Sequence, residues 1–232
     1  METVRGCCGS GKKSMLKLNF DLPNQKLRLL CLGAHSDDIE IGCGGTILRL
    51  LSENKGSSAY WVVFAANAER RAEAEKSAHL FLGEAARKEI IIKEFRESYF
   101  PYIGAEIKEY FEFLKQEFEP DIIFTHYRHD LHQDHRMLSE LTWNTFRDHL
   151  ILEYEIMKYD GDIGTPNFFV SLSGLLCQKK IENILNCFKS QSSRQWFSED
   201  VFYSLLRLRG VESNSPSKFA EAFYCRKITL AK

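Results

Sequence analysis

Two short clusters of histidine and aspartate carry the side chains in this sequence that are best suited to chemistry. One occupies residues 35–38 and reads H-S-D-D, and the other occupies residues 132–135 and reads H-Q-D-H. Each directly follows an apolar run that predicts a buried strand, and open α/β sheets build their sites just beyond the carboxyl ends of strands. Imidazole nitrogens and carboxylate oxygens are common protein ligands of Zn²⁺. The two clusters together therefore predict a metal site.

Within the first cluster, spacing separates two kinds of role. His35 and Asp38 stand three residues apart, so they could converge on one ion from a single turn of chain. Asp37 lies between them and must point in another direction. A catalytic zinc site has three protein ligands and an open position for water, and the proton of that water needs an uncoordinated base. We therefore expect His35 and Asp38 to bind metal and Asp37 to act as the base.

The third ligand must come from elsewhere in the chain, and spacing leaves its identity open. Four of the seven histidines fall within ten residues, namely His126, His129, His132 and His135. A single histidine is more often a surface or structural residue than a ligand, but clustering favours a ligand role. His132 and His135 are again three residues apart, so either could bind the metal. We expect Asp134, which lies between them, to hydrogen-bond an imidazole and fix its tautomer.

Apolar runs and amphipathic stretches alternate along the chain, which is typical of strand-helix-strand units and a largely parallel sheet. The sequence predicts strands over 27–33, 60–66, 90–95, 121–126, 151–157 and 168–172, and helices over 44–53, 69–82, 103–118, 134–147, 177–188 and 199–209, followed by a final apolar run over 222–225. The glycines of 42–45 predict a turn with positive φ or close backbone approach. We expect one domain over 21–232 with a C-terminal elaboration, after a flexible arm over 1–20.

Composition excludes several classes of protein. The 31 basic and 32 acidic residues leave a net charge of −1, so no overall field steers the chain toward nucleic acid or an anionic membrane. No stretch after Lys12 and Lys13 has the pattern of a signal peptide or a membrane span. The seven cysteines are odd in number and lack a repeated C-x-x-C spacing. We therefore expect a cytoplasmic protein with a small-molecule partner, without nucleic acid and without a membrane span.

The sequence also resembles a known family. The A-H-S-D-D of 34–38 and the G-C-G-G of 42–45 resemble the A-H-P-D-D-E…G-C-G-G signature of the PIG-L (LmbE-like) zinc-dependent N-deacetylases, and the D-x-H-x-D-H of 130–135 is similar to their second motif. C-terminal landmarks follow in the expected order at 166–170, 189–191, 209–210 and 220–223. The resemblance spans about residues 27–223 and implies a Rossmann-like α/β fold, with a mostly parallel sheet flanked by helices.

The resemblance implies a role for each reactive side chain of the two clusters. The metal ligands of the family fall on His35, Asp38 and His135. The general base falls on Asp37, and the residue that stabilises the oxyanion falls on His132. The choice between His132 and His135 as the third ligand, which spacing left open, therefore rests on the resemblance.

Two further roles follow from the same resemblance. Asp134 is expected to orient His132. An arginine at the start of the second helix contacts substrate in relatives, and either Arg70 or Arg71 could fill that place. We favour Arg71, because its distance to the Leu-Gly pair at 82–83 fits the family pattern better.

The implied activity is hydrolysis of an amide bond. Members of the family use Zn²⁺ to remove an acetyl group from an amino sugar or sugar conjugate, and several assemble as homo-oligomers. A site of two histidines and one aspartate also suits Fe²⁺ and Co²⁺. We expect Asp37 to take the proton of the attacking water and a protonated His132 to stabilise the oxyanion. The alternatives are a deformylase or other amidohydrolase acting on a nucleotide-linked sugar or small metabolite, and a sugar-binding pseudoenzyme with a broken metal or base set.

Two positions depart from the family pattern. Ser36 replaces the usual proline, and Ile39 replaces the acidic residue that follows the aspartate pair, with Glu40 one place later. Proline presets φ, so its loss softens the loop. Neither position is an expected ligand or base, so the metal set and the base are complete.

Overall fold

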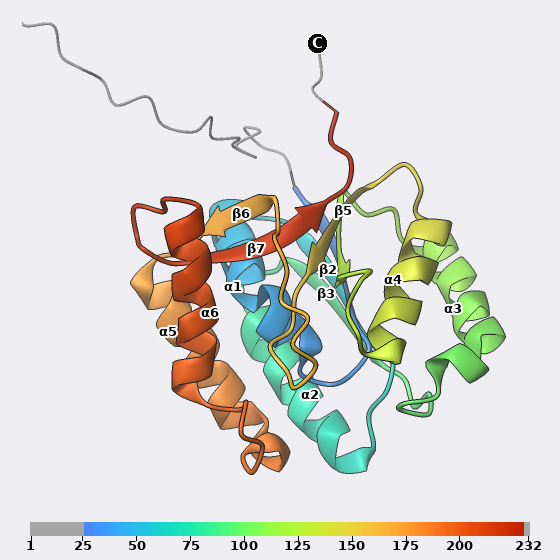
Figure 1. Cartoon of the computed structure of the whole chain (residues 1–232). Coiled ribbons are helices and arrows are strands. Elements are labelled where there is room, and N and C mark those ends of the chain that lie inside the picture. The colour runs from blue at the N-terminus through green and yellow to red at the C-terminus, as the bar shows by residue number, and fades with distance from the viewer. Residues whose placement is uncertain (1–25, 230–232) are drawn as a thin grey trace, which may run out of the picture.

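A computed structural model describes residues 26–229, and the predicted arm over 1–20 lies outside them. Seven strands form one sheet in the order β3-β2-β1-β4-β5-β7-β6 (Figure 1). The strands are β1 (Arg28–Gly33), β2 (Ser58–Val63), β3 (Arg87–Ile92), β4 (Ile122–His126), β5 (Leu150–Tyr154), β6 (Phe168–Ser171) and β7 (Ala220–Cys225). Strands β1 to β5 pair in parallel, whereas β7 runs antiparallel to β5 and β6. The predicted fold class is confirmed.

Helices cover both faces of this sheet. They are α1 (Asp38–Glu53), α2 (Ala68–Phe81), α3 (Gly104–Glu117), α4 (Gln133–Thr145), α5 (Gly174–Cys187) and α6 (Glu199–Glu212), with two 3₁₀ turns, η1 (Phe100–Tyr102) and η2 (Lys189–Gln191). Figure 1 shows α3 and α4 on one face and α1, α2, α5 and α6 on the other. Each face has its own buried apolar cluster. The C-terminal elaboration consists of α5, η2 and α6 together with the antiparallel pair β6 and β7.

Burial explains why these segments form these elements. β1 is buried from its second residue to its last, as expected for a parallel strand with helices on both faces. In α3, which the sequence predicts as a helix over 103–118, Ile107, Phe111 and Leu114 are fully buried at helical spacing. The helix bounds agree with the sequence patterns to within a few residues, with one exception in α1.

The exception is the glycine-rich segment over 42–45, which lies inside α1 rather than in a turn before it. The helix begins at Asp38, six residues before the predicted start of 44. The glycines of this segment do not have positive φ. They allow close approach instead, because a Cβ atom built on Gly42 would lie 2.1 Å from the Tyr154 ring. Glycine here brings α1 directly onto the sheet beneath it, so the expected close approach is confirmed and the expected positive φ is wrong.

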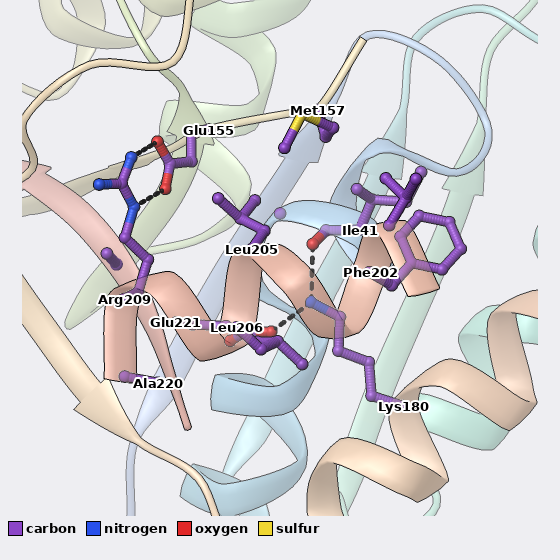
Figure 2. A pocket seen from close by; sticks show the side chains of 13 residues that line it. Ile41, Glu155, Met157, Lys180, Phe202, Leu205, Leu206, Arg209, Ala220 and Glu221 are labelled. Carbon is purple, nitrogen blue, oxygen red and sulfur yellow. Dashed lines mark hydrogen bonds and ion pairs between the residues drawn. The ribbon is translucent and has the colours of Figure 1, made fainter. Parts of the chain in front are cut away.

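A buried ion pair completes the backbone hydrogen bonds in the middle of α1 (Figure 2). Lys180 Nζ lies 2.6 Å from Glu221 Oε1 and donates to the carbonyl oxygen of Ile41 at 2.7 Å. The Glu221 carboxylate also accepts the N–H groups of Gly45 at 2.8 Å and Thr46 at 2.6 Å. Both charged side chains are only 3% exposed. The pair therefore connects α5 and β7 to the helix that begins with the first cluster.

The cavity next to this ion pair, which Figure 2 shows from close by, is not a substrate site. Its volume is about 20 Å³, which is roughly the space that one water molecule needs. It is lined by side chains from α1, α5, α6 and β7. A sugar cannot enter it, so the site must be sought at the carboxyl edge of the sheet.

The sequence also led us to expect a chain without a membrane span, a single domain, a cytoplasmic location and a homo-oligomer. Within 26–229, no helix is both long and apolar enough to cross a bilayer. The single domain over 21–232, the cytoplasmic location and the homo-oligomeric assembly stay predictions.

Candidate metal centre

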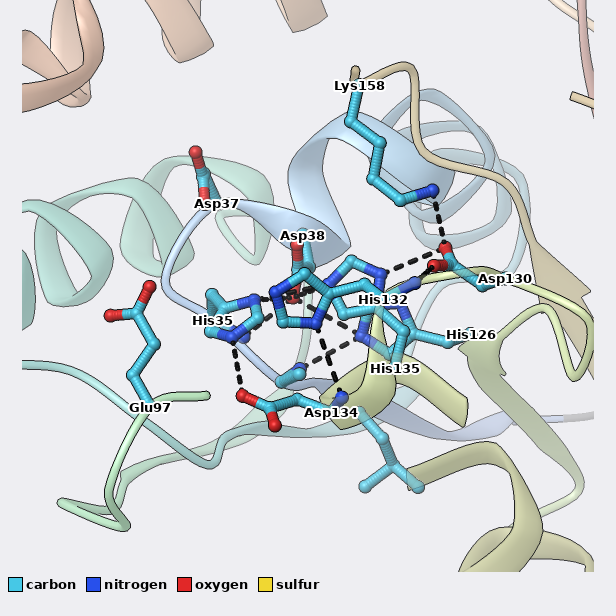
Figure 3. Close-up of polar contacts among 12 residues, drawn as sticks. His35, Asp37, Asp38, Glu97, His126, Asp130, His132, Asp134, His135 and Lys158 are labelled. Carbon is cyan, nitrogen blue, oxygen red and sulfur yellow. Dashed lines mark hydrogen bonds and ion pairs between the residues drawn. The ribbon is translucent and has the colours of Figure 1, made fainter. Parts of the chain in front are cut away.

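The two clusters meet at the carboxyl ends of β1 and β4, which are neighbours in the sheet. From β1 the chain moves outward to β2 and β3 on one side, and then returns to place β4 and β5 on the other. The gap between β1 and β4 is therefore the point at which the strand order reverses, where open α/β sheets bind their ligands. Figure 3 shows the side chains of the two clusters converging there.

Three polar atoms form a compact triangle at this place. His35 Nδ1 lies 3.1 Å from His135 Nε2 and 3.3 Å from Asp38 Oδ2. His135 Nε2 lies 3.6 Å from Asp38 Oδ2, which closes the triangle. A tetrahedral metal with ligand bonds of about 2.0–2.2 Å separates its ligand atoms by about 3.3–3.6 Å. The spacing of the three atoms therefore fits a tetrahedral metal ion.

The far nitrogen of each imidazole in this triangle contacts a carboxylate. His35 Nε2 lies 3.2 Å from Asp134 Oδ2, and His135 Nδ1 lies 2.9 Å from Asp130 Oδ2. A carboxylate can only accept, so each far nitrogen carries the hydrogen and each near nitrogen keeps its lone pair. Carboxylates orient the histidine ligands of metals in the same manner. Two lone pairs and a carboxylate oxygen then face one another, and a proton or a metal ion must lie among them.

The pKa shifts describe a site that favours positive charge. Burial alone would lower the pKa of His35, but the carboxylates of Asp38 and Asp134 raise it to about 10. Burial alone would raise the pKa of Asp38, but the neighbouring imidazoles of His135, His126 and His35 hold it well below its usual range. For His135, burial and the nearby His126 lower the pKa to about 3, so its ring is neutral near pH 7. Buried carboxylates thus stabilise a cation here.

Two other combinations of side chains also lie close enough to hold a metal ion. They are His35 with His132 and His135, and Asp38 with His126 and His135. His126 Nε2 accepts the N–H of Ala34 at 3.0 Å, which engages its lone pair. A metal bound to this nitrogen would break that hydrogen bond. The triangle of His35, Asp38 and His135 can bind a metal without such a loss, so it is the combination that we favour.

His126 and His129 differ in their distance from the centre. The His126 ring stacks on the His135 ring with centroids 3.9 Å apart, and His126 Nε2 lies 3.3 Å from Asp38 Oδ2. His129 packs instead against the Tyr127 ring, with centroids 5.4 Å apart. Clustering in the sequence therefore indicated the right neighbourhood, but His126 has a supporting position that the sequence did not assign.

His132 lies beside the triangle at the start of α4. Its Nδ1 accepts the N–H of Asp134 at 3.3 Å, so the hydrogen of a neutral ring is on Nε2. Its ring centroid is 4.9 Å from that of His35. Burial and the charge of His35 lower the pKa of His132. This direction favours the neutral ring, which offers one N–H donor, whereas the sequence led us to expect a protonated ring.

Asp134 contacts an imidazole, as spacing led us to expect, but the ring that its carboxylate contacts is His35 rather than the His132 that the resemblance named. Only the backbone N–H of Asp134 contacts His132. The carboxylate contacts His35 and accepts the N–H groups of Ser98 at 2.6 Å and Phe100 at 3.2 Å. Asp134 thus connects a histidine of the triangle to the loop that follows β3.

Asp130 is the supporting residue that sequence reasoning missed. Its Oδ2 accepts from His135 and lies 3.1 Å from Lys158 Nζ. Burial alone would raise the pKa of Asp130, but the hydrogen bond from His135, with the neighbouring His126 and Lys158, holds it well below its usual range. The D-x-H-x-D-H motif contained this residue, but the motif alone gave it no role. Figure 3 shows Asp130 between His135 and Lys158.

Asp37 lies beside the triangle and contacts none of its atoms in Figure 3. Its Oδ1 is 3.0 Å from Arg70 Nη2, and Arg70 Nη1 is 3.3 Å from Glu97 Oε2. Burial raises the pKa of Asp37 to about 6, against the lowering effect of Arg70 and with the charge of Asp38 raising it further. A carboxylate with this pKa is a suitable base near neutral pH.

The two candidate arginines point to different places. Asn67 caps α2 by accepting the N–H of Arg70, and the guanidinium of Arg70 reaches Asp37. Arg71 Nη2 instead donates to the carbonyl oxygen of Ile92 at 2.8 Å and lies 3.0 Å from Glu94. The structure brings Arg70 to the centre and directs Arg71 to the end of β3, although sequence spacing had favoured Arg71.

An open hollow lies next to Arg70 at the carboxyl ends of β2 and β3. Its volume is about 400 Å³, and small or polar residues line much of it, including Ala65, Asn67, Glu94 and Glu97. Glu97 also pairs with Arg70, which contacts Asp37. The hollow therefore lies close to Arg70 and Asp37, and it is large enough for a sugar ring.

Comparisons with known proteins find a family model that matches the sequence and solved structures that share the fold. A family model named PIG-L and described as GlcNAc-PI de-N-acetylase matches residues 30–146, just over half of the chain. The match contains both clusters. Among proteins of curated function, none matches the sequence.

Solved structures share the fold at low sequence identity. A conserved protein of Thermus thermophilus superposes with a TM-score of 0.72 at 20% identity, over 89% of this chain and 97% of that one. The N,N'-diacetylchitobiose deacetylase of Pyrococcus horikoshii has a TM-score of 0.67 at 22% identity, over 89% and 87%. The 4-carboxy-2-hydroxymuconate hydratase GalB of Pseudomonas putida has a TM-score of 0.65 at 13% identity, over 90% and 99%. These likenesses show the fold.

Proposed function

We propose, because this chain belongs to the PIG-L family of GlcNAc-PI de-N-acetylases, that it is a metal-dependent hydrolase that removes an N-acetyl group from an amino sugar or sugar conjugate. The observation that carries the proposal is the triangle of His35, Asp38 and His135, whose edges of 3.1, 3.3 and 3.6 Å fit a tetrahedral ion. A complete ligand set, beside an Asp37 carboxylate that is no part of the triangle, argues against a pseudoenzyme.

The proposed cofactor is Zn²⁺, held by His35, Asp38 and His135. A metal of this kind lowers the pKa of a bound water and polarises a carbonyl group. Fe²⁺ and Co²⁺ suit the same ligands, so the native ion is to be settled by measurement. The residues of the chain supply the rest of the chemistry.

Asp37 is the proposed general base. It is buried, it lies beside the triangle, and its pKa of about 6 leaves it ionised but basic near pH 7. It takes a proton from the attacking water and can then deliver that proton to the departing amine. Arg70, 3.0 Å away, holds the carboxylate in place.

His132 is the proposed stabiliser of the oxyanion. Because its Nδ1 accepts the N–H of Asp134, its Nε2–H is free to donate toward the developing negative charge. We propose that it does so as a neutral ring. Asp134 supports the site through its carboxylate contact with His35 and through this backbone N–H.

The hollow beside Arg70 is the proposed place for the sugar ring. Glu97 and Asn67 line it and offer partners for hydroxyl groups, while Arg70 lies between it and Asp37. We propose Arg70 as the substrate-contacting arginine. Arg71 is the weaker candidate because it is paired with Glu94 and the Ile92 carbonyl.

The proposal is tested by release of acetate. Purified protein is stripped with a chelator, reloaded with Zn²⁺, Fe²⁺ or Co²⁺, and offered N-acetylglucosamine, N,N'-diacetylchitobiose and N-acetylglucosaminyl-phosphatidylinositol, with N-formyl analogues in parallel. We expect metal-dependent acetate release from at least one substrate. Preferential formate release would favour the deformylase alternative. Activity that survives complete removal of metal would refute the metal-dependent mechanism.

The likeness to GalB favours one further candidate. The same fold serves a hydratase in that protein, so the fold alone does not select amide hydrolysis. In a hydratase, water would add to a carbon-carbon double bond and no acid would be released. Loss of absorbance from conjugated enol acids, measured with the same metal-loaded protein, distinguishes this activity from deacetylation.

A further inference from the structure

A chain of polar contacts leads away from His135 to the segment between β5 and β6. Asp130 Oδ2 accepts from His135 Nδ1 at 2.9 Å and lies 3.1 Å from Lys158 Nζ. Lys158 Nζ also lies 2.5 Å from Asp162 Oδ2. The same oxygen of Asp162 accepts the N–H of Leu131 at 2.8 Å. Figure 3 shows the part of this chain from Lys158 to His135.

This chain of contacts is largely shielded from water. Lys158 is 10% exposed at its side chain, Asp130 is 2% and Asp162 is 7%. Exposed ion pairs contribute little, but a shielded carboxylate that loses its cation is strongly destabilised. Lys158 therefore helps to hold the Asp130 carboxylate in position.

Lys158 lies on the segment over 155–167, which we call the strap. The strap connects β5 to β6, and its contacts reach back to the loop before α4 through Lys158 and Asp162. On its other side, Glu155 pairs with Arg209, which also donates to the carbonyl oxygen of Gly164. The strap is thus held at both ends, and one of its contacts leads to a proposed metal ligand.

We propose that Lys158 is a positioning residue for the metal centre, which fixes the Asp130 carboxylate and through it the orientation of His135. The inference rests on the proposed metal site. Metal binding and docking of the strap then support each other, because a coupling between two sites acts equally in both directions. Residues that support histidine ligands in this manner change metal affinity by about 10–100-fold when they are replaced.

The first test compares the metal affinity of Lys158→Met with that of the native chain, by competition with a chromophoric chelator for Zn²⁺ and Co²⁺. We expect about tenfold weaker binding, and recovery of most of it in Lys158→Arg, which keeps the charge. Lys115→Met, an exposed lysine of α3, serves as the matched control and should bind metal normally. Asp130→Asn removes the carboxylate that Lys158 contacts, so it shows how much metal affinity depends on the contact between Asp130 and His135 as a whole.

The opposite result is also physically clear. If Lys158 acted only as a positive charge near the ion, its removal would strengthen metal binding. Unchanged or tighter binding by a folded Lys158→Met protein would therefore overturn the proposal, as would failure of Lys158→Arg to restore affinity. If Lys158→Met does not fold, the comparison of Lys158→Arg with Lys158→Gln decides between the same outcomes.

The second test measures the reverse direction by hydrogen exchange. We expect metal to slow exchange at the Leu131 amide and over the strap in the native chain, and this protection to be absent from Lys158→Met at saturating metal. A native chain that binds no divalent metal would overturn the metal site and this inference together. Binding of metal without protection of the strap would overturn only the inference.

Discussion

At the scale of single residues, adjacent aspartates have opposite surroundings. Asp38 faces three imidazoles, which hold its pKa well below the usual range against the effect of burial. Asp37 faces Arg70, but burial dominates and raises its pKa to about 6. The first is therefore suited to bind a cation, and the second to exchange a proton near neutral pH.

The division of roles predicts a clear outcome for Asp37→Asn. Because Asp37 is not part of the triangle, this variant should retain metal with near-native affinity. Loss of the base should lower kcat by about 10²–10⁴-fold. Metal content by atomic absorption and acetate release together check this. Asp148→Asn, an exposed aspartate, is the control, and near-native turnover of Asp37→Asn would show that another group is the base.

The pKa of Asp37 also predicts a pH profile. A base acts in its ionised form, so kcat should rise with pH through about 6 and then level off. Arg70 lowers this pKa, so Arg70→Met should move the acidic limb of the kcat profile to higher pH. Arg71→Met should leave the limb where it is, because Arg71 is paired elsewhere. A limb that stays in place in Arg70→Met would contradict the assignment.

Sequence reasoning succeeded for these residues only as far as spacing could take it. Cluster spacing placed His35, Asp38 and the second cluster in one neighbourhood, because two adjacent parallel strands end there. The resemblance favoured Arg71 over Arg70, and spacing could not correct that choice, because successive helix residues point about 100° apart and the helix phase was unknown. Nor could it place the Asp130 and Asp134 carboxylates, because their partners depend on the path of the loop between β4 and α4 and on the direction of that helix.

At the scale of elements, α1 is positioned by contacts far from the reactive groups. Gly42 allows the helix to approach Tyr154 closely, and the Lys180–Glu221 pair satisfies backbone groups one turn further on. The sequence indicated a glycine-rich site segment, but an ion pair between α5 and β7 leaves no periodic signal. The direction of α1 therefore depends on the C-terminal elaboration.

This arrangement predicts a large effect for Lys180→Met. The substitution leaves the Glu221 charge buried without its cation, so it should lower the free energy of unfolding by about 3–5 kcal/mol. The double variant Lys180→Met with Glu221→Gln should be more stable than the single variant, because the amide oxygen still accepts hydrogen bonds without a charge. Urea denaturation measures all three chains. Lys179→Met, on the exposed side of α5, is the matched control; equal stability of single and double variants would contradict the reasoning.

At the scale of the whole molecule, the sheet order explains why residues a hundred positions apart share one site. Alternation of strands and helices predicted a parallel sheet, and right-handed connections with a reversal of strand order bring the ends of β1 and β4 together. The antiparallel placement of β7 between β5 and β6 was beyond the sequence pattern, because short apolar runs do not encode their neighbours. That placement positions Glu221 and the strap.

Because the triangle joins both halves of the sheet, metal binding should stabilise the entire fold. A ligand that binds only the native state adds about 2.7 kcal/mol at a concentration about one hundred times its Kd, which for a chain of this size raises Tm by about 5–10 °C. Scanning calorimetry of stripped and Zn²⁺-loaded protein measures the shift. His135→Ala should lose most of it, whereas Asp37→Asn should keep it, since only His135 supplies a corner of the triangle. Equal shifts in both variants would place the metal away from His135, outside the triangle and outside both other combinations, since each of those also includes His135.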